Sequence, residues 1–365
     1  MAIEKINKIG MKVGKIYSIQ YLRGIAALLV VFLHIRTILP DFLKPFVLNG
    51  GIGVDIFFII SGFIIYFATH KEVEATPRVY LTKRAFRIWP LFIVVWFITS
   101  IFAFQEQPFY KVIKAVFFIH NDYAQGAPGF GFNMIGPAWT LTFEIVFYAI
   151  FMVACAISHK YRGIICILLL ITIPSALQLY FNGSISFSAY TTANVESGHF
   201  AYGIIRVLGC NIYSEFGVGV LLSMIVSKIN NIKNSFPATI ISTLIFIACI
   251  YLILNIKVSE AERFILALIT FLSALMFGFG FVKEIRALSF LGDISYSIYL
   301  CHWMVIRLFM EFFPSQWTME GWGVKVPVIL LTTLIISWLM NKFIEKPCIS
   351  FARRLLSNSY KVSPA

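Results

Sequence analysis

Apolar stretches of about 20 residues recur along the whole chain, and they constrain its fold more than any other feature. A helix needs about this length to cross the hydrocarbon core of a bilayer. Hydrophobic residues fill 59% of the 365 positions and charged residues 13%, which excludes an ordinary soluble domain. We therefore expect an all-α polytopic membrane protein, one bundle of about ten transmembrane helices over residues 18–39, 50–69, 86–104, 137–157, 163–181, 204–227, 237–256, 262–282, 289–311 and 323–344.

The distribution of lysine and arginine predicts how these helices are oriented. Most of the 30 basic residues lie in the tails and in alternate loops on one side. The positive-inside rule places both termini in the cytoplasm, with tails at about 1–17 and 346–365. The net charge of +13 is then an anchor at the inner lipid surface and not a sign of nucleic-acid binding. We expect a single membrane domain over 1–365, without a cleavable signal peptide and without a metal site, because the six cysteines lack ligand spacing.

Two ionisable residues lie inside the first predicted helix. Arg23 and His34 are eleven positions apart, which is a rise of roughly 16 Å and a rotation within about 20° of three turns. Both side chains therefore project from one face, at different depths. Ionisable groups inside a membrane are costly and usually face a cavity with a function. The pair indicates one elongated site, with the cation near the inner surface and the imidazole in the outer half.

Counting from the ends of the predicted helices places four polar residues at a similar depth. They are His34, Asp55, Glu144 and His302. Two imidazoles and two carboxylates at one level form a plausible acid–base site, in which a carboxylate orients a histidine ring. The alternative is that these groups only tie helices together by hydrogen bonds in lipid. Ser61, in FFIISGF, is a candidate nucleophile, although a Ser-Gly pair in a helix is more often a close-packing site.

A basic cluster precedes the third predicted helix on the cytoplasmic side. It contains Lys83, Arg84 and Arg87. Arg84 and Arg87 are three residues apart and share a helix face, a geometry suited to binding phosphate oxygens. Such residues also set membrane orientation, which is the alternative reading. On the other side, the loops 120–134 and 181–202 combine aromatic and polar residues that suit sugar rings, but an interfacial aromatic belt explains them equally well.

Six segments of the chain resemble, in the same order, motifs of the acyltransferase-3 family of bacterial integral-membrane O-acyltransferases. They are Arg23-x10-His34, GVDIFFIISGF (53–63), KRAFRIWPL (83–91), AWTLTFEIVFY (138–148), LGDISYSIYLCHW (291–303) and FIEKP (343–347). The segment WTLT stands where the family often has WSLS, and Ile145 stands where a second glutamate is common. The resemblance is to the stand-alone type, without a fused esterase-like domain.

The resemblance implies transfer of an acyl group, usually acetyl, from a coenzyme A thioester to a hydroxyl, often on a cell-surface glycan. By motif position, Arg23 and His34 would be the essential pair. Further functional positions would be Asp55, Arg84, Arg87, Trp139 and Glu144. Tyr296 and His302, both in the fifth segment, are additional candidate functional residues.

We therefore expect a membrane-bound O-acetyltransferase of the bacterial inner membrane that acts on a glycan or lipid-linked glycan. Acyl-coenzyme A would be the donor substrate, bound by Lys83, Arg84 and Arg87 with Arg23 deeper, and no cofactor would be tightly bound. His34 would be the general base, with Asp55 or Glu144 orienting it, or it would carry the acyl group itself. Two alternatives remain open: a proton-coupled transporter or flippase, and an acyltransferase for a small-molecule acceptor.

Overall fold

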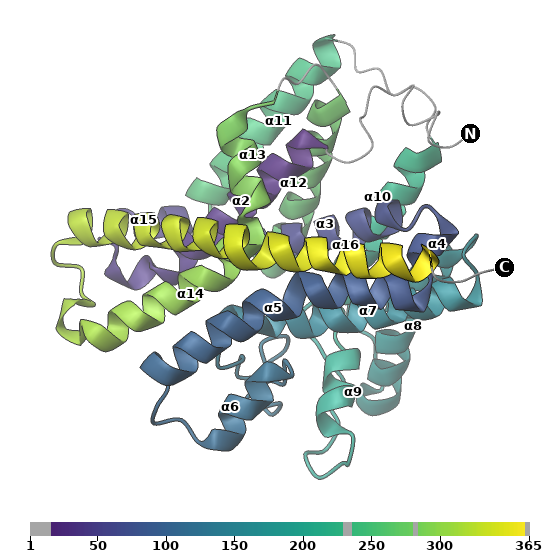
Figure 1. Ribbon diagram of the computed structural model, residues 1–365, viewed down its shortest axis with the longest axis horizontal. Coiled ribbons are helices and arrows are strands. Elements are labelled where there is room, and N and C mark those ends of the chain that lie inside the picture. The colour runs from purple at the N-terminus through teal and green to yellow at the C-terminus, as the bar shows by residue number, and fades with distance from the viewer. Residues whose placement is uncertain (1–15, 229–235, 280–283, 362–365) are drawn as a thin grey trace. The chain divides into compact units, whose positions relative to one another are not determined.

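The computed structural model describes residues 16–228, 236–279 and 284–361, and in these ranges all regular structure is helical (Figure 1). The long helices are α2 (Tyr17–His34), α3 (Ile52–Ala68), α5 (Pro77–Ala103), α7 (Trp139–Ile157), α8 (Arg162–Asn182), α10 (Tyr213–Lys228), α11 (Phe236–Asn255), α12 (Glu260–Phe279), α14 (Ser295–Phe312), α15 (Trp322–Met340) and α16 (Lys346–Lys361). The shorter α-helices are α4 (Glu72–Ala75), α6 (Phe109–Val116), α9 (Tyr202–Leu208) and α13 (Arg286–Asp293). Short 3-10 helices cover Arg36–Ile38, Lys44–Gly51, Gly136–Ala138 and Pro314–Gln316, and a π-helical turn, η5 (Asn341–Glu345), joins α15 to α16.

The expected class, an all-α polytopic membrane protein, is confirmed. Within the described ranges, eight helical segments are long and apolar enough to cross a membrane, and α9 with α10, bent by 42°, would make a ninth. About ten were expected. The difference lies mainly at 289–311, where the chain breaks at Ile294 into α13 and α14, and α14 is not among the eight. Arg307 and Glu311 lower the hydropathy of α14.

The chain divides into two compact units, and each unit combines segments that are far apart in sequence. Unit 1 comprises Met1–Phe67 and Glu215–Tyr296, and unit 2 comprises Ala68–Ser214 and Ser297–Ala365. Each unit has its own apolar core. The candidate site residues are therefore described below unit by unit.

In unit 1, α2 packs against α12 and α13, and α11 packs along α12 (Figure 1). A close crossing joins α3 to α10. A Cβ at Gly62 would lie 2.0 Å from the carbonyl oxygen of Phe216, and a Cβ at Gly219 would lie 2.0 Å from that of Ile59. Glycine is required at both positions, because it lets two backbones approach this closely in a membrane. The Ser-Gly pair at 61–62 thus lies at a packing contact.

In unit 2, α7 packs against α8, and α16 lies alongside α5 (Figure 1). The core between these helices is rich in aromatic residues. Tyr80 on α5 stacks on Phe151 of α7, with ring centroids 6.0 Å apart. The contact between α5 and α16 includes the rings of Phe86 and Phe351. These contacts fix the basic segment of α5 against both α7 and the C-terminal helix.

Candidate active site

Arg23 and His34 both lie on α2, which ends at His34. The expected helix ran to residue 39, but Pro40 disfavours helical backbone just before it, and the chain turns into a 3-10 helix at Arg36. The ring Nδ1 of His34 lies 2.8 Å from the carbonyl oxygen of Val30. Because a carbonyl can only accept, Nδ1 carries the hydrogen, and in the neutral ring Nε2 holds the lone pair. The imidazole is thus oriented with its basic nitrogen away from its own backbone.

Arg23 belongs to a polar chain that links two of the six motif segments. Its guanidinium donates to Oε1 of Gln20 at 3.3 Å, and Gln20 donates through Nε2 to Asp293 at 2.6 Å. Asp293 is the aspartate of the LGD segment at the end of α13. The first and fifth segments of the family pattern therefore meet in unit 1, and Gln20 holds them together.

Asp55 lies in the first turn of α3 and is 2% exposed. Arg263 of α12 forms an ion pair with it through two nitrogens, with Nε 2.7 Å from Oδ2 and Nη2 3.1 Å from Oδ1. Glu215, which is also buried, lies beside Asp55 and interacts electrostatically with both Asp55 and Arg263. The three residues form a compact group of two carboxyl groups and one cation.

Sequence reasoning missed both partners of Asp55. Arg263 lies 208 positions from Asp55 in the sequence, so no local pattern connects the two residues. Glu215 gave a usable signal, because a glutamate inside a predicted apolar helix is costly and calls for a partner. The expected role of Asp55 in orienting His34 stays a prediction, and the contacts above are the ones in which Asp55 is engaged.

In unit 2, Arg84 lies between two tyrosine rings. Its guanidinium carbon is 5.9 Å from the ring centre of Tyr80 and 5.5 Å from that of Tyr148. The hydroxyl of Tyr148 donates to Glu144, one turn earlier on α7. Cation–π contacts of this kind hold an arginine without neutralising its charge. Tyr148 thus joins the basic cluster of α5 to the carboxylate of α7, and its position four residues after Glu144 was a readable signal.

A small pocket of about 160 Å³ opens beside Arg84. Lys83, Arg84 and Arg87 line it from α5, and Arg353 lines it from α16. Lys83 pairs with Glu74, whereas the buried Nε of Arg84 has no hydrogen-bond partner within the described residues. The pocket therefore has a strong excess of positive charge and suits an anion. Arg353 was missed, since the sequence alone does not show that α16 folds back along α5.

The remaining predicted residues fall in both units. His302 is fully buried on α14, and its Nδ1 lies 3.0 Å from the carbonyl oxygen of Ile298. Trp139 begins α7 and contacts the ring of Phe143. Unit 1 holds Arg23, His34, Asp55, Ser61 and Tyr296, and unit 2 holds Lys83, Arg84, Arg87, Trp139, Glu144 and His302. The expectation that four of them share one depth stays a prediction.

The loop before α7 contains a buried histidine that sequence reasoning did not single out. His120 is 1% exposed, and rings of Tyr123, Phe130 and Phe143 surround it at centroid distances of 5.4, 5.4 and 6.0 Å. Neither ring nitrogen has a hydrogen-bond partner in the part of the chain that the structure describes. Burial lowers the pKa of His120 to about 4. The ring is therefore neutral at ordinary pH.

A family model described as an acyltransferase domain matches residues 16–342. The O-acetyltransferase OatA of Staphylococcus aureus (strain NCTC 8325 / PS 47) is 26% identical over 367 residues, which is 92% of this chain and 58% of that protein. The exopolysaccharide production protein ExoZ of Rhizobium meliloti (strain 1021) is 24% identical over 275 residues, 71% of this chain and 77% of that protein.

No solved structure matches the chain. The chain spans somewhat more than half of the length of the OatA relatives that it matches. The family match covers nearly all of the described residues and includes five of the six segments in full. The chain belongs to the acyltransferase-3 family.

Proposed function

We propose that this protein is a membrane-bound O-acyltransferase that moves an acyl group, most simply acetyl, from acyl-coenzyme A to a hydroxyl of a cell-surface or lipid-linked polysaccharide. Its family membership and the names of two relatives, an O-acetyltransferase and an exopolysaccharide production protein, support the reaction and the acceptor class. The observation that supports acyl-coenzyme A as the donor is the pocket lined by Lys83, Arg84, Arg87 and Arg353.

Coenzyme A fits this pocket by charge and in part by size. Its 3′-phosphate and diphosphate are multiply charged anions, and arginine matches phosphate oxygens with two parallel hydrogen bonds. Pockets that enclose a whole small ligand measure about 300–1,000 Å³, so a pocket of about 160 Å³ takes a phosphate group and leaves the rest of the donor outside. The Nε of Arg84, which has no hydrogen-bond partner among the described residues, is a donor that such a phosphate would satisfy.

The transfer step needs one base. Nε2 of His34 takes the proton of the acceptor hydroxyl as its oxygen bonds to the thioester carbonyl carbon. The carbon–sulfur bond then breaks, and the coenzyme A thiolate leaves with the proton returned from the imidazolium. In the variant with an acyl-histidine, Nε2 attacks the thioester carbonyl carbon first and the coenzyme A thiolate leaves. The acceptor oxygen then displaces the imidazole, and the hydroxyl proton passes to the thiolate. Both routes end with an ester and free coenzyme A.

Donor binding is tested with two arginines that are neighbours in sequence. Both arginines are exposed, but Arg353 lines the pocket and Arg354 is not part of its lining. The purified full-length protein in lipid nanodiscs is titrated with coenzyme A, and Arg353→Ala is compared with Arg354→Ala. We expect Arg353→Ala to weaken binding about tenfold, the loss of one charge-assisted contact, and Arg354→Ala to leave it nearly unchanged. Equal effects of the two variants would mean that only net surface charge matters.

Transfer itself is measured with labelled acetyl-coenzyme A and a panel of glycans. His34→Ala should abolish transfer and leave coenzyme A affinity within about twofold, because only the chemical step loses its base. A wild-type protein that binds coenzyme A but modifies no acceptor in the panel would leave the donor assignment intact and reject the acceptor class. A protein that binds no coenzyme A would reject the donor assignment and favour a transporter.

A further inference from the structure

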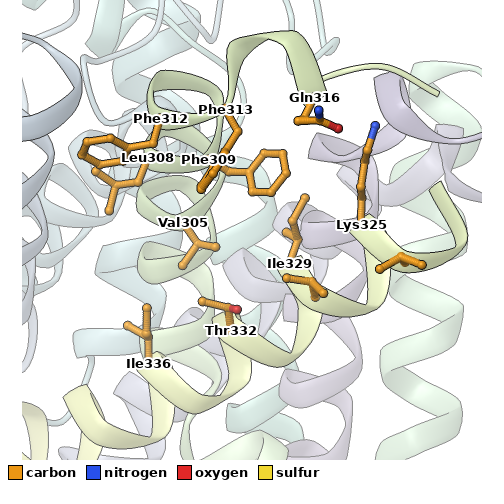
Figure 2. A pocket seen from close by; sticks show the side chains of 12 residues that line it. Val305, Leu308, Phe309, Phe312, Phe313, Gln316, Lys325, Ile329, Thr332 and Ile336 are labelled. Atoms are coloured by element: carbon orange, nitrogen blue, oxygen red, sulfur yellow. The ribbon is translucent and has the colours of Figure 1, made fainter. Parts of the chain in front are cut away.

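An apolar groove of about 500 Å³ runs between α14 and α15 in unit 2 (Figure 2). Apolar side chains from both helices face each other across it, among them Val305 and Phe309 from α14 and Ile329 from α15. Two polar residues, Gln316 and Lys325, lie together at one end, beside Phe313 (Figure 2). The groove therefore has a long hydrocarbon-like body and one charged end.

The length of the groove corresponds to one leaflet of a bilayer. Its α15 wall extends from Lys325 to Ile336, which are eleven positions apart, or roughly 16 Å of helix. Half of a hydrocarbon core of about 30 Å is close to this value. Trp317 and Trp322 flank the chain turn at the charged end, and tryptophan is enriched where the membrane meets water. A helix α15 that crosses the bilayer would therefore bring the charged end to the depth of the lipid headgroups.

Lys325 has no acidic partner among the residues that the structure describes. Its ammonium group donates only to neutral oxygens of Thr318, Oγ1 at 3.3 Å and the carbonyl at 3.5 Å, and within the described residues it has no ion pair. Lysine in the first turn of a helix is also disfavoured by the helix dipole, whereas an anion there is favoured. No side chain caps the N-terminus of α15, and a Cβ at Gly323 would meet no atom within 4 Å. The end of the groove is open and suited to an anionic group.

We infer that this groove binds one anionic glycerophospholipid, with an acyl chain along the apolar walls and the headgroup phosphate at Lys325. A zwitterionic lipid would fill the same walls, but its own cation would compete for the phosphate and weaken the contact with the lysine. This site is separate from the pocket on α5 and α16, and it does not depend on the acyl-transfer reaction.

The chain offers a matched pair of substitutions for each part of the site. Val328 lines the groove and is 47% exposed, whereas Leu331, on the same helix and 59% exposed, does not line it. Val328→Trp would fill the groove, and Leu331→Trp adds the same bulk to the surface outside it. Lys325→Ala removes the charge at the groove. Its control, Lys342→Ala, removes a lysine that lies just beyond the other end of α15 and contacts Trp338.

The experiment reconstitutes the full-length protein in nanodiscs of phosphatidylcholine with a minor fraction of phosphatidylglycerol, and native mass spectrometry counts the lipids that stay bound. We expect the wild type, Leu331→Trp and Lys342→Ala to retain one phosphatidylglycerol preferentially. Lys325→Ala should lose about fivefold in preference, as for one lysine at a lipid surface, and Val328→Trp should retain neither lipid. Retention of both lipids without preference by the wild type, or unchanged preference in Lys325→Ala, would overturn the assignment. Lipid retention by Val328→Trp equal to that by Leu331→Trp would overturn it as well.

Discussion

The buried histidine at position 120 makes the stability of this protein depend on pH. Its pKa is lowered by burial from about 6.5 to about 4. Below pH 6.5 the unfolded chain therefore binds a proton that the folded chain does not accept until the pH approaches 4, so acid favours unfolding. At 1.36 kcal/mol for each pKa unit, the free energy of unfolding falls by about 2 kcal/mol at pH 5 and by about 3 kcal/mol below pH 4. This contribution is absent above about pH 7.

The variant His120→Phe tests this contribution. Phenylalanine keeps a ring within the cage of Tyr123, Phe130 and Phe143, and it sacrifices no hydrogen bond, because neither imidazole nitrogen has one in the described structure. Thermal unfolding is measured in detergent at pH 7.5 and pH 5.0. Between pH 7.5 and pH 5.0, the free energy of unfolding of the wild type should fall by about 2 kcal/mol more than that of His120→Phe. The control is His199→Phe, which alters a partly exposed histidine beside Phe200 and should follow the wild type.

Two outcomes would contradict this reasoning. If His120→Phe loses as much stability as the wild type on acidification, the cage does not exclude the proton. If His120→Phe is less stable than the wild type by more than about 2 kcal/mol at pH 7.5, the imidazole has a hydrogen-bond partner that the rings alone do not supply. A second variant, His120→Leu, separates a loss of the nitrogen atoms from a clash caused by the larger ring.

Three further predictions concern the polar groups of each unit. Arg263→Met should destabilise the protein by about 3–5 kcal/mol in thermal unfolding, since it leaves two buried carboxyls without a cation. Asp55→Asn should destabilise it much less, because Glu215 can then pair with Arg263. Equal destabilisation by the two variants would contradict a site in which both carboxyls share Arg263. Tyr148→Phe should lower the transfer rate and the affinity for coenzyme A together, because it releases Glu144 beside Arg84, and an unchanged affinity would show that the two are independent. Cys301→Ala should leave transfer nearly unchanged in the labelled-donor assay.

Hydropathy predicted the helices better than their ends. The second expected helix, 50–69, agrees closely with Ile52–Ala68. By contrast, α5 begins at Pro77 instead of 86, because its basic residues continue the helix although they end the apolar stretch. A hydropathy pattern also cannot show that the LGD segment ends one helix and that Ser295 begins another.

The candidate site was predictable only where partners lie close in sequence. The bond from Tyr148 to Glu144 spans one helical turn and could have been inferred. The pairing of Asp55 with Arg263 depends on how α3 and α12 pack, and no local pattern encodes it. The same holds for Arg353, whose role depends on α16 returning along α5.

Arg84 contacts Tyr148, and Tyr148 contacts Glu144. These contacts make anion binding in the pocket and the charge state of Glu144 thermodynamically reciprocal. An anion that draws the guanidinium of Arg84 into the pocket changes the field at the tyrosine ring and therefore the hydrogen bond that Glu144 receives. Linkage requires that any change in the charge of Glu144 alter the affinity of the pocket by the same factor. Anion binding in the pocket and the charge of Glu144 on α7 are thus one coupled equilibrium, in which a change in either one shifts the other.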